Sequence, residues 1–142
     1  MTPAINRIVV FFETLTPASV ARCAELYTED AYFKDPFNEV RGTAAIAGIF
    51  GHMYAQLLEP RFVITNRVVE GDQAWLSWDF HFRFRRFSPE VAQTIRGATH
   101  LRLAPDGRIQ WHRDYWDAAE ELYEKLPLLG RLMRWLKRRA NT

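Results

Sequence analysis

Residues 74–87 read AWLSWDFHFRFRRF, and large apolar side chains fill alternate positions of this stretch. Successive side chains of a β-strand point to opposite faces, so this period of two predicts a long strand with one apolar face. We expect that face in the core or in a pocket wall. It carries Leu76, Trp78, Phe80, Phe82 and Phe84. The opposite face, with Asp79, His81, Arg83 and Arg85, is expected at solvent or at an interface.

Three more strands are predicted around this one, at residues 61–69, 91–103 and 108–116. The segments between them are rich in glycine, proline, serine and aspartate, which favour tight turns. These turns are Glu70-Gly71-Asp72, Ser88-Pro89-Glu90 and Pro105-Asp106-Gly107. Four strands joined by short turns predict an antiparallel meander.

Helical periodicity dominates the chain before residue 60. Residues 3–15 place Ile5, Ile8, Val9, Phe12 and Leu15 at three- and four-residue spacings, which predicts a helix with one buried face. Thr16 and Pro17 predict the start of a second helix, which we expect to continue to about Tyr27. Its expected inward side chains are Val20, Cys23, Ala24 and Tyr27.

A short strand is predicted at residues 31–35, because Pro36 cannot continue a helix. Gly42 and Thr43 then begin a third predicted helix that reaches about Leu58. The predicted fold class is therefore α+β, with three N-terminal helices packed on a curved, mainly antiparallel sheet. Residues 1–117 are expected to form one domain.

Residues 118–142 are predicted to form a helical extension, with a helix at 118–126 and a last helix opened by Pro127. The last helix places Leu128, Leu129, Leu132, Met133 and Leu136 on one side and basic residues on the other. Such a helix suits an anionic membrane surface or an acidic partner. Alternatively, it covers the domain or a second copy of the chain, and this interpretation is preferred.

The composition is that of a globular protein, with 142 residues of which 48% are hydrophobic and 25% charged. The net charge is +2, but residues 127–142 hold five basic residues and no acid, so the remainder carries −3. This distribution does not fit a nucleic-acid-binding face. No stretch has the length of a transmembrane span or the features of a cleaved signal, so we expect a cytoplasmic protein.

One segment resembles a known family. AELYTEDAYFKDPFNEVRGTAAIAGIF, residues 24–50, has acidic, aromatic and Asp-Pro residues before an Arg-Gly-Thr helix start, in the manner of ketosteroid isomerases. The order of elements over residues 3–117 also resembles the cone-shaped fold shared by nuclear transport factor 2, ketosteroid isomerases, scytalone dehydratase and SnoaL-type polyketide cyclases. Because this fold hosts enzymes, binding modules and transport factors, it implies a pocket more firmly than a reaction.

The resemblance implies that Asp35 occupies the position of the isomerases' proton-shuttling carboxylate. It also places Phe11 or Phe12 where those enzymes have an oxyanion-binding tyrosine, and Thr99 where they have a protonated aspartic acid. Phenylalanine cannot donate a hydrogen bond, so the chain lacks that part of the isomerase pattern.

The last predicted strand offers further acid-base groups. His112, Asp114 and Trp116 share one face of QWHRDYW, residues 110–116, and the resemblance turns that face into the cone. Together with Asp35, His112 and Asp114 could act as catalytic acid and base groups. Alternatively, Asp35 caps a turn, and His112 and Asp114 form a buried structural pair.

The predicted function is that of a small-molecule pocket protein, a cofactor-independent lyase, isomerase or hydrolase-like enzyme that acts on an apolar compound. The alternative is a noncatalytic ligand-binding or interaction module of the same fold. The expected pocket-lining residues are Phe12, Tyr32, Phe50, Trp78, Phe80, Thr99, Leu101 and Trp116. The four histidines lack the spacing of a metal motif, so no metal site is predicted.

Three large aromatic residues are expected on the outer face of the sheet: Trp75, Trp111 and Tyr115. Large apolar side chains on an outer sheet face often mark a contact with a partner. The sequence therefore predicts a homodimer formed through this face.

Overall fold

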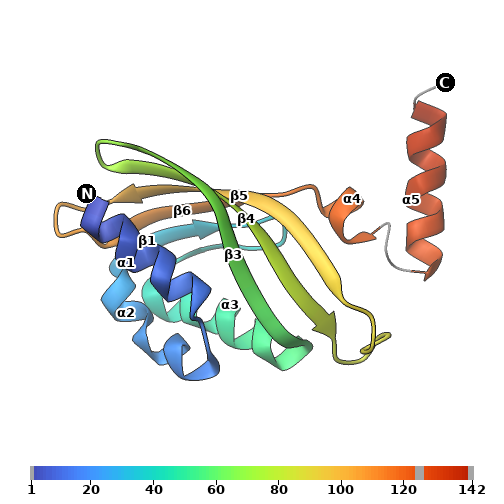
Figure 1. The fold of residues 1–142 in the computed structure, drawn as a ribbon, viewed down its shortest axis with the longest axis horizontal. Helices are drawn as coiled ribbons and strands as arrows, with labels where there is room; N and C mark the ends of the chain where they lie inside the picture. The colour runs from blue at the N-terminus through green and yellow to red at the C-terminus, as the bar shows by residue number, and fades with distance from the viewer. Residues whose placement is uncertain (1, 124–126, 141–142) are drawn as a thin grey trace.

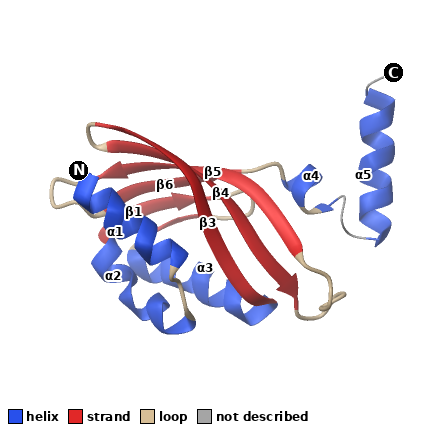
Figure 2. Ribbon diagram, in the orientation of Figure 1, coloured by secondary structure: helices blue, strands red, loops and turns tan. Residues whose placement is uncertain are grey.

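The body of the protein is a curved six-stranded sheet (Figures 1 and 2). The computed structural model describes residues 2–123 and 127–140, without the side chains of 127–130 and 133. Its strands are β1 (Tyr27–Lys34), β2 (Glu39–Arg41), β3 (Leu57–Glu70), β4 (Gln73–Phe84), β5 (Gln93–Leu103) and β6 (Ile109–Tyr115). They lie in the order β2-β1-β6-β5-β4-β3. β1 and β6 are parallel, and the other neighbours are antiparallel.

The N-terminal helices lie on one side of the sheet (Figure 2). They are α1 (Thr2–Glu13), the 3-10 helix η1 (Pro17–Arg22), α2 (Cys23–Leu26) and α3 (Thr43–Gln56). Gly42 precedes α3 with a φ of 104°, a conformation that glycine adopts without the steric cost paid by other residues. The predicted α+β class and the meander of β3 to β6 are confirmed.

Strand β4 has the predicted alternation. Leu76, Trp78, Phe80 and Phe82 are buried, whereas Trp75 on the other face is 43% exposed. Gly71 and Gly107 have positive φ angles of 60° and 88°, which glycine adopts readily. They form the turns between β3 and β4 and between β5 and β6, where turns were predicted.

The predicted second helix was wrong in its length and its end. Thr16 does cap it, because its hydroxyl accepts from the Ser19 amide and the Ser19 hydroxyl accepts from the Thr16 amide. However, a 3-10 helix and one α-helical turn follow, Ala24 is exposed, and Tyr27 begins β1. Tyr27 is fully buried in this strand, where pairing with β6 outweighs the local helical spacing.

Strand β1 is longer than predicted and ends at Lys34, so Asp35 lies in the following turn. Strand β2 was not predicted. It has only three residues, none of them buried, and it pairs with β1 alone. A segment this short carries too little periodicity to be recognised.

The apolar core lies in two parts along β4. The first packs α1, β1 and β5 together and includes Ile5, Ile8, Tyr27, Leu101 and Ile109, each at most 1% exposed. The second contains Trp78, Phe80, Phe82 and Ile95. The structure fills the first part tightly and leaves a cavity beside the second.

Two helices follow the sheet, α4 (Ala118–Glu121) and α5 (Pro127–Ala140). The helix expected at 118–126 is shorter within the described chain, and residues 124–126 of that prediction lie outside the described residues. The expected stripe residues Leu128, Leu129 and Met133 lie among the side chains that are not described. Within residues 2–123 and 127–140, none of the helices has the length and apolar character needed to cross a membrane.

Candidate functional site

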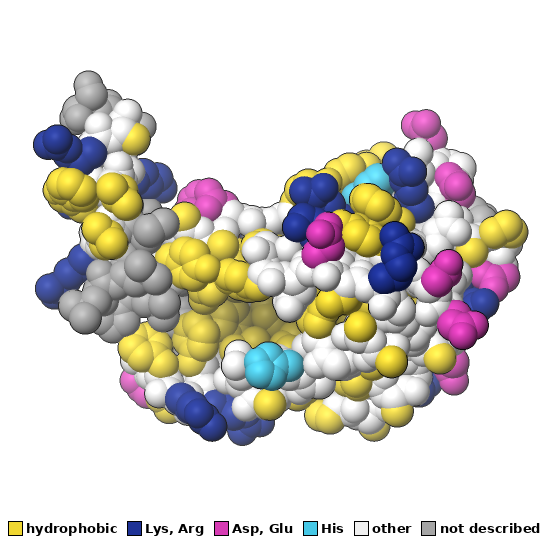
Figure 3. All heavy atoms as spheres, turned by 180° about the vertical axis from the view of Figure 1, so that it is seen from behind, with side chains coloured by type: hydrophobic (Ala, Val, Ile, Leu, Met, Phe, Trp, Pro, Cys, Tyr) yellow, Lys and Arg dark blue, Asp and Glu magenta, His cyan; other side chains and the backbone are white. Residues whose placement is uncertain are grey.

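An apolar cavity of about 680 Å³ lies between α3 and the inner face of the sheet. Figure 3 shows the protein hollowed by a trough of hydrophobic side chains. Aromatic residues dominate the lining, with Phe33, Phe37, Phe50, Phe62, Trp78, Phe80, Phe82, Phe84 and Trp116. Its polar lining residues are Asp35, Asn38, His52, Gln56 and Asp114. The volume and the lining suit a small molecule that is mostly apolar.

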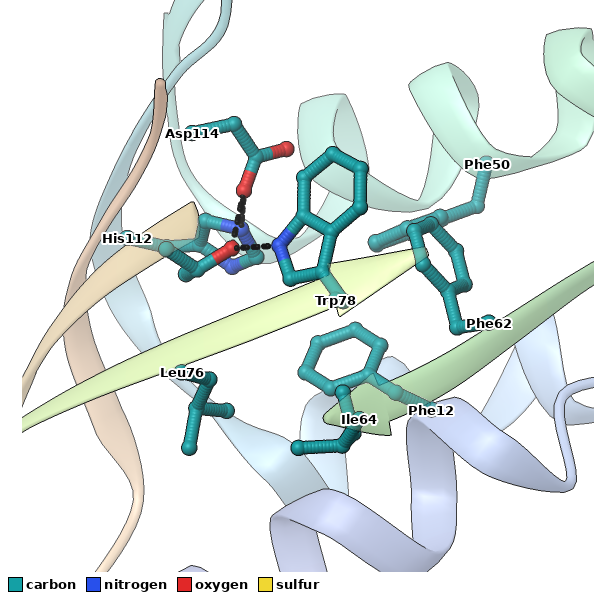
Figure 4. A pocket seen from close by; sticks show the side chains of 9 residues that line it. Phe12, Phe50, Phe62, Ile64, Leu76, Trp78, His112 and Asp114 are labelled. Atoms are coloured by element: carbon teal, nitrogen blue, oxygen red, sulfur yellow. Dashed lines mark hydrogen bonds and ion pairs between the residues drawn. The ribbon is translucent and has the colours of Figure 1, made fainter. Parts of the chain in front are cut away.

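A smaller pocket of about 20 Å³ adjoins this cavity, since Phe50, Phe62, Trp78 and Asp114 line both. Figure 4 shows its apolar side chains facing His112 and Asp114. About 10–15 Å³ is enough to hold one water molecule, so this pocket can accept a water or the end of a ligand.

A chain of hydrogen bonds fixes Asp114 at the wall of this pocket. Its Oδ1 accepts from the Thr99 hydroxyl at 2.6 Å and lies 2.7 Å from His112 Nε2. The Trp78 indole donates to Thr99 over 2.8 Å, and the Tyr27 hydroxyl lies 2.8 Å from His112 Nδ1. The five residues come from four strands, so the network forms only when the sheet is assembled.

The direction of these hydrogen bonds follows from chemistry. An indole N–H can only donate, so Thr99 uses its own proton toward Asp114. Burial and the nearby Asp114 raise the pKa of Tyr27 well above its ordinary value, so its hydroxyl stays protonated. The Asp114 carboxylate can only accept, so His112 Nε2 carries a proton and donates it to Oδ1. In the tautomer with a single proton on Nε2, Nδ1 accepts from the Tyr27 hydroxyl. Both branches of the network therefore end on the same carboxylate oxygen.

The second oxygen of Asp114 has no hydrogen-bond partner among the described residues. The Asp114 side chain is 18% exposed and lines the cavity and the smaller pocket. His112 has less freedom, because it is 3% exposed and both its ring nitrogens are engaged. Asp114 is thus the member of the network whose carboxylate can offer a lone pair to a ligand in the cavity.

Asp35 lies at the same end of the cavity but is held differently. Its Oδ1 accepts from the amides of Phe37 and Asn38 at 2.8 and 2.7 Å, and the Asn38 side chain contacts both carboxylate oxygens. These contacts close the turn after β1. The structure therefore brings His112 and Asp114 into one network and leaves Asp35 outside it, at the cavity edge.

Most of the predicted lining residues lie at the cavity. Phe12, Phe50, Trp78 and Thr99 line the smaller pocket, and Phe80 and Trp116 line the larger one.

The predictions for Tyr32 and Leu101 were wrong. Tyr32 lies on the other face of β1, where it stacks on Trp111 and donates to Glu39, and the next residue, Phe33, lines the cavity instead. A shift of one residue along a strand reverses the face. Leu101 is completely buried in the first part of the core.

Two contributors escaped the sequence analysis. Tyr27 was placed on a helix, and its partner His112 is 85 positions away in the chain. Gly97 was not singled out, yet a Cβ there would fall 2.5 Å from the Trp78 ring. For Tyr27, the available signal was the period of two that links it to the buried residues Ala31 and Phe33 on one face of β1. A bulge between Tyr27 and Tyr32 interrupts this pattern.

The outer face of the sheet carries the expected aromatic residues. Trp75 stacks on His100, Tyr115 lies beneath Arg113, and Trp111 lies beneath Arg102. Burial, and to a lesser degree Arg102, lowers the pKa of His100. The homodimer through this face stays a prediction.

Over residues 2–123 and 127–140, no three His, Cys, Asp or Glu side chains converge in an arrangement that could hold a metal ion. The candidate site consists of the apolar cavity and the hydrogen-bonded carboxylate.

The helices on a curved open sheet define the fold class shared by nuclear transport factor 2 and ketosteroid isomerase. Within that class, residues 8–112 match the SnoaL-like domain, and the chain belongs to this family. No curated protein matches the sequence significantly.

Similar solved structures agree on the fold. A putative SnoaL-like polyketide cyclase from Shewanella denitrificans is 20% identical, with 86% of this chain and 98% of that chain covered and a TM-score of 0.69. An LEH-like epoxide hydrolase from M. tuberculosis is 17% identical, with coverages of 84% and 82% and a TM-score of 0.70. A Catenulispora acidiphila protein with a ketosteroid isomerase-like fold, in complex with trimethylamine, is also 17% identical, with coverages of 84% and 88% and a TM-score of 0.71.

Proposed function

We propose that this protein is an acid-base enzyme that needs no cofactor and acts on a small, mostly apolar molecule, with Asp114 as the base. One observation carries the proposal. Asp114 presents an oxygen without a protein partner at an aromatic cavity, while its other oxygen is fixed by His112 and Thr99. A base held in place before the substrate arrives needs little reorganisation during proton transfer.

In the proposed reaction, the second oxygen of Asp114 removes a proton from the substrate or from a water beside it. The new O–H bond forms on Asp114 as the old bond to hydrogen breaks. When the proton comes from the substrate, the electron pair passes to a carbonyl oxygen or expels a leaving group. When it comes from water, the water oxygen bonds to an epoxide carbon as the ring C–O bond breaks and leaves an alkoxide. Asp114 then returns the proton to the product. His112 and Thr99 act as positioning residues, because they contact Asp114 rather than the open part of the cavity.

The lining supports an apolar carbonyl, hydroxyl or epoxide compound as the substrate class. The rings of Phe62 and Phe80 stack with their centroids 4.4 Å apart, and the Trp78 ring meets Phe62 edge to face. Such surfaces favour apolar carbon frameworks but do not select one reaction. The descriptions of two similar structures, an epoxide hydrolase and a putative polyketide cyclase, are compatible with this range of acid-base chemistry.

The substitution Asp114→Asn tests the proposal without a known substrate. 5-Nitrobenzisoxazole is an apolar probe whose ring C–H proton is taken by a base as its N–O bond breaks, giving a coloured phenolate. We expect the protein to accelerate this elimination over free acetate, and Asp114→Asn to reduce kcat/KM by about 100-fold or more. The amide keeps the size of the side chain but lacks the basic oxygen.

Asp35→Asn is the matched control, because it alters the other carboxylate at the cavity. We expect it to retain most of the elimination rate. A large loss in Asp35→Asn with none in Asp114→Asn would assign the base to Asp35. No acceleration by the unmodified protein, together with probe binding, would support the noncatalytic ligand-binding alternative.

A further inference from the structure

We propose that helix α5 binds the surface of anionic lipid membranes. Its described side chains include three exposed apolar residues, Leu132, Trp135 and Leu136, which are 50%, 48% and 47% exposed. They lie three and four positions apart and therefore share one side of the helix. Figure 1 shows α5 standing apart from the sheet and from α1 to α3.

The charge of α5 selects the kind of surface. Arg134, Lys137 and Arg138 lie on the side of the helix away from Leu132, and Arg131 lies at the flank, one turn before Trp135. Residues 127–142 contain no Asp or Glu, whereas the rest of the chain carries a net charge of −3. An anionic surface would attract α5 and repel the remainder, which sets the orientation of the bound protein.

Trp135 and Arg139 form a pair suited to the boundary between lipid and water. The Arg139 guanidinium lies 5.5 Å from the centroid of the Trp135 ring, one helical turn away. In this arrangement the indole can enter the headgroup region while the guanidinium remains at the level of the phosphates. A cationic side with Trp and Leu opposite it is typical of helices that lie in the membrane interface.

The start of α5 lies close in the chain to the mouth of the cavity. Leu122 lines the cavity, and Tyr123 contacts Phe37, a cavity residue that is 53% exposed. α5 begins shortly afterwards, at Pro127. Membrane attachment through α5 would therefore hold the cavity near a phase that concentrates apolar molecules, whether or not Asp114 is a base.

Co-sedimentation of the full chain with lipid vesicles tests this inference. We expect binding to phosphatidylcholine vesicles with about 30 mol% phosphatidylglycerol, and much weaker binding to pure phosphatidylcholine. Trp135→Glu and Arg134→Glu should each weaken the binding by about tenfold, through loss of apolar burial and of charge attraction respectively. Raising the salt to about 0.5 M should weaken it further.

Two substitutions away from α5 serve as controls. Val10→Glu replaces an exposed apolar residue of α1, and Arg86→Glu reverses an exposed charge between β4 and β5. Both should bind vesicles as the unmodified chain does, and circular dichroism should show that all variants keep their fold.

Equal binding to neutral and anionic vesicles, or no response to the α5 substitutions, would overturn the proposal. So would a fall in molecular mass by light scattering in Trp135→Glu without any vesicle binding by the unmodified chain, because α5 would then join copies of the protein. The elimination by Asp114 is measured without lipid, so either proposal can fail alone.

Discussion

Asp35 and Asp114 lie at the same end of the cavity, Asp35 in the turn after β1 and Asp114 on the neighbouring parallel strand β6, yet the chain uses them differently. Lys34 of β1 pairs with Arg113 of β6, so the two carboxylates follow adjacent positions in the sheet. The donors to Asp35 are Phe37 and Asn38, two and three positions further along its own turn. Those to Asp114 include Thr99, 15 positions away on β5.

This difference separates a carboxylate that shapes the backbone from one that is presented to a ligand. Local amides occupy Asp35, in the manner of residues that cap turns. Side-chain donors from other strands occupy one oxygen of Asp114 and leave the other toward the cavity. The following substitutions probe this contrast, beginning with the largest expected effect on stability.

Tyr27→Phe should have the largest effect on stability, because it removes a buried donor of the Asp114 network. His112 Nδ1 would remain buried without a partner, which typically costs about 1–3 kcal/mol of unfolding free energy. Urea denaturation at pH 7 measures the loss. Tyr32→Phe is the matched control on the same strand, because its hydroxyl bonds to Glu39 at the surface. An equal, small effect of both substitutions would contradict a special role for the buried network.

We also expect the stabilisation by Tyr27 to depend on pH. Burial raises the pKa of Tyr27 in the folded protein above its unfolded value of about 10. The stabilisation is therefore complete below about pH 10 and is lost as the pH rises through the folded pKa. Tyr27→Phe should show a weaker decline of stability between about pH 9 and 11 than the unmodified chain.

Asp35→Ala should have a moderate effect, of about 1 kcal/mol, because it removes the acceptor for two turn amides. Asp35→Asn should cost less, since the amide oxygen can still accept these hydrogen bonds. Thermal and urea denaturation of the two variants measure the difference. If Asp35→Ala lost the elimination activity while keeping its stability, the contrast with Asp114 would be wrong.

Substitution of His100, on the outer face of the sheet, should have the smallest effect on stability. It contrasts this outer face with the buried network of Asp114. Burial lowers its pKa in the folded protein below the unfolded value of about 6.5. Its contribution to stability is therefore complete above about pH 6.5 and is lost as the pH falls through the folded pKa. His100→Gln should flatten this slope between about pH 5 and 7 in urea titrations. An unchanged slope would assign the acid sensitivity to other groups.

Local patterns in the sequence were enough for much of the fold. The alternation from Leu76 to Phe82, the Thr16 cap and the turns at Gly71 and Gly107 each depend on neighbouring residues, and each was predicted. The order of elements over residues 3–117 resembled a fold that includes SnoaL-type cyclases, and the match over residues 8–112 confirms the SnoaL-like family.

The faces of β1 and the partners of the two carboxylates required the tertiary structure. Tyr27 was expected on a helix and Tyr32 in the cavity, because nothing local specifies the parallel pairing of β1 with β6 or its bulge. His112 and Asp114 share a strand face by simple alternation, and this was visible in the sequence. Tyr27 was not, and Thr99 was expected to line the pocket but not to bond Asp114, because hydrogen bonds between strands depend on register, which forms only when distant segments pair.

The sequence by itself therefore determined the first and third predicted helices, the meander of β3 to β6 and the apolar character of the inner sheet face. Only the tertiary structure decided that Asp35 closes its own turn while Asp114 faces the cavity with an oxygen free of described partners. The physical reason is that side-chain periodicity is a property of neighbouring residues. The availability of a carboxylate depends on which donors the folded sheet brings to it.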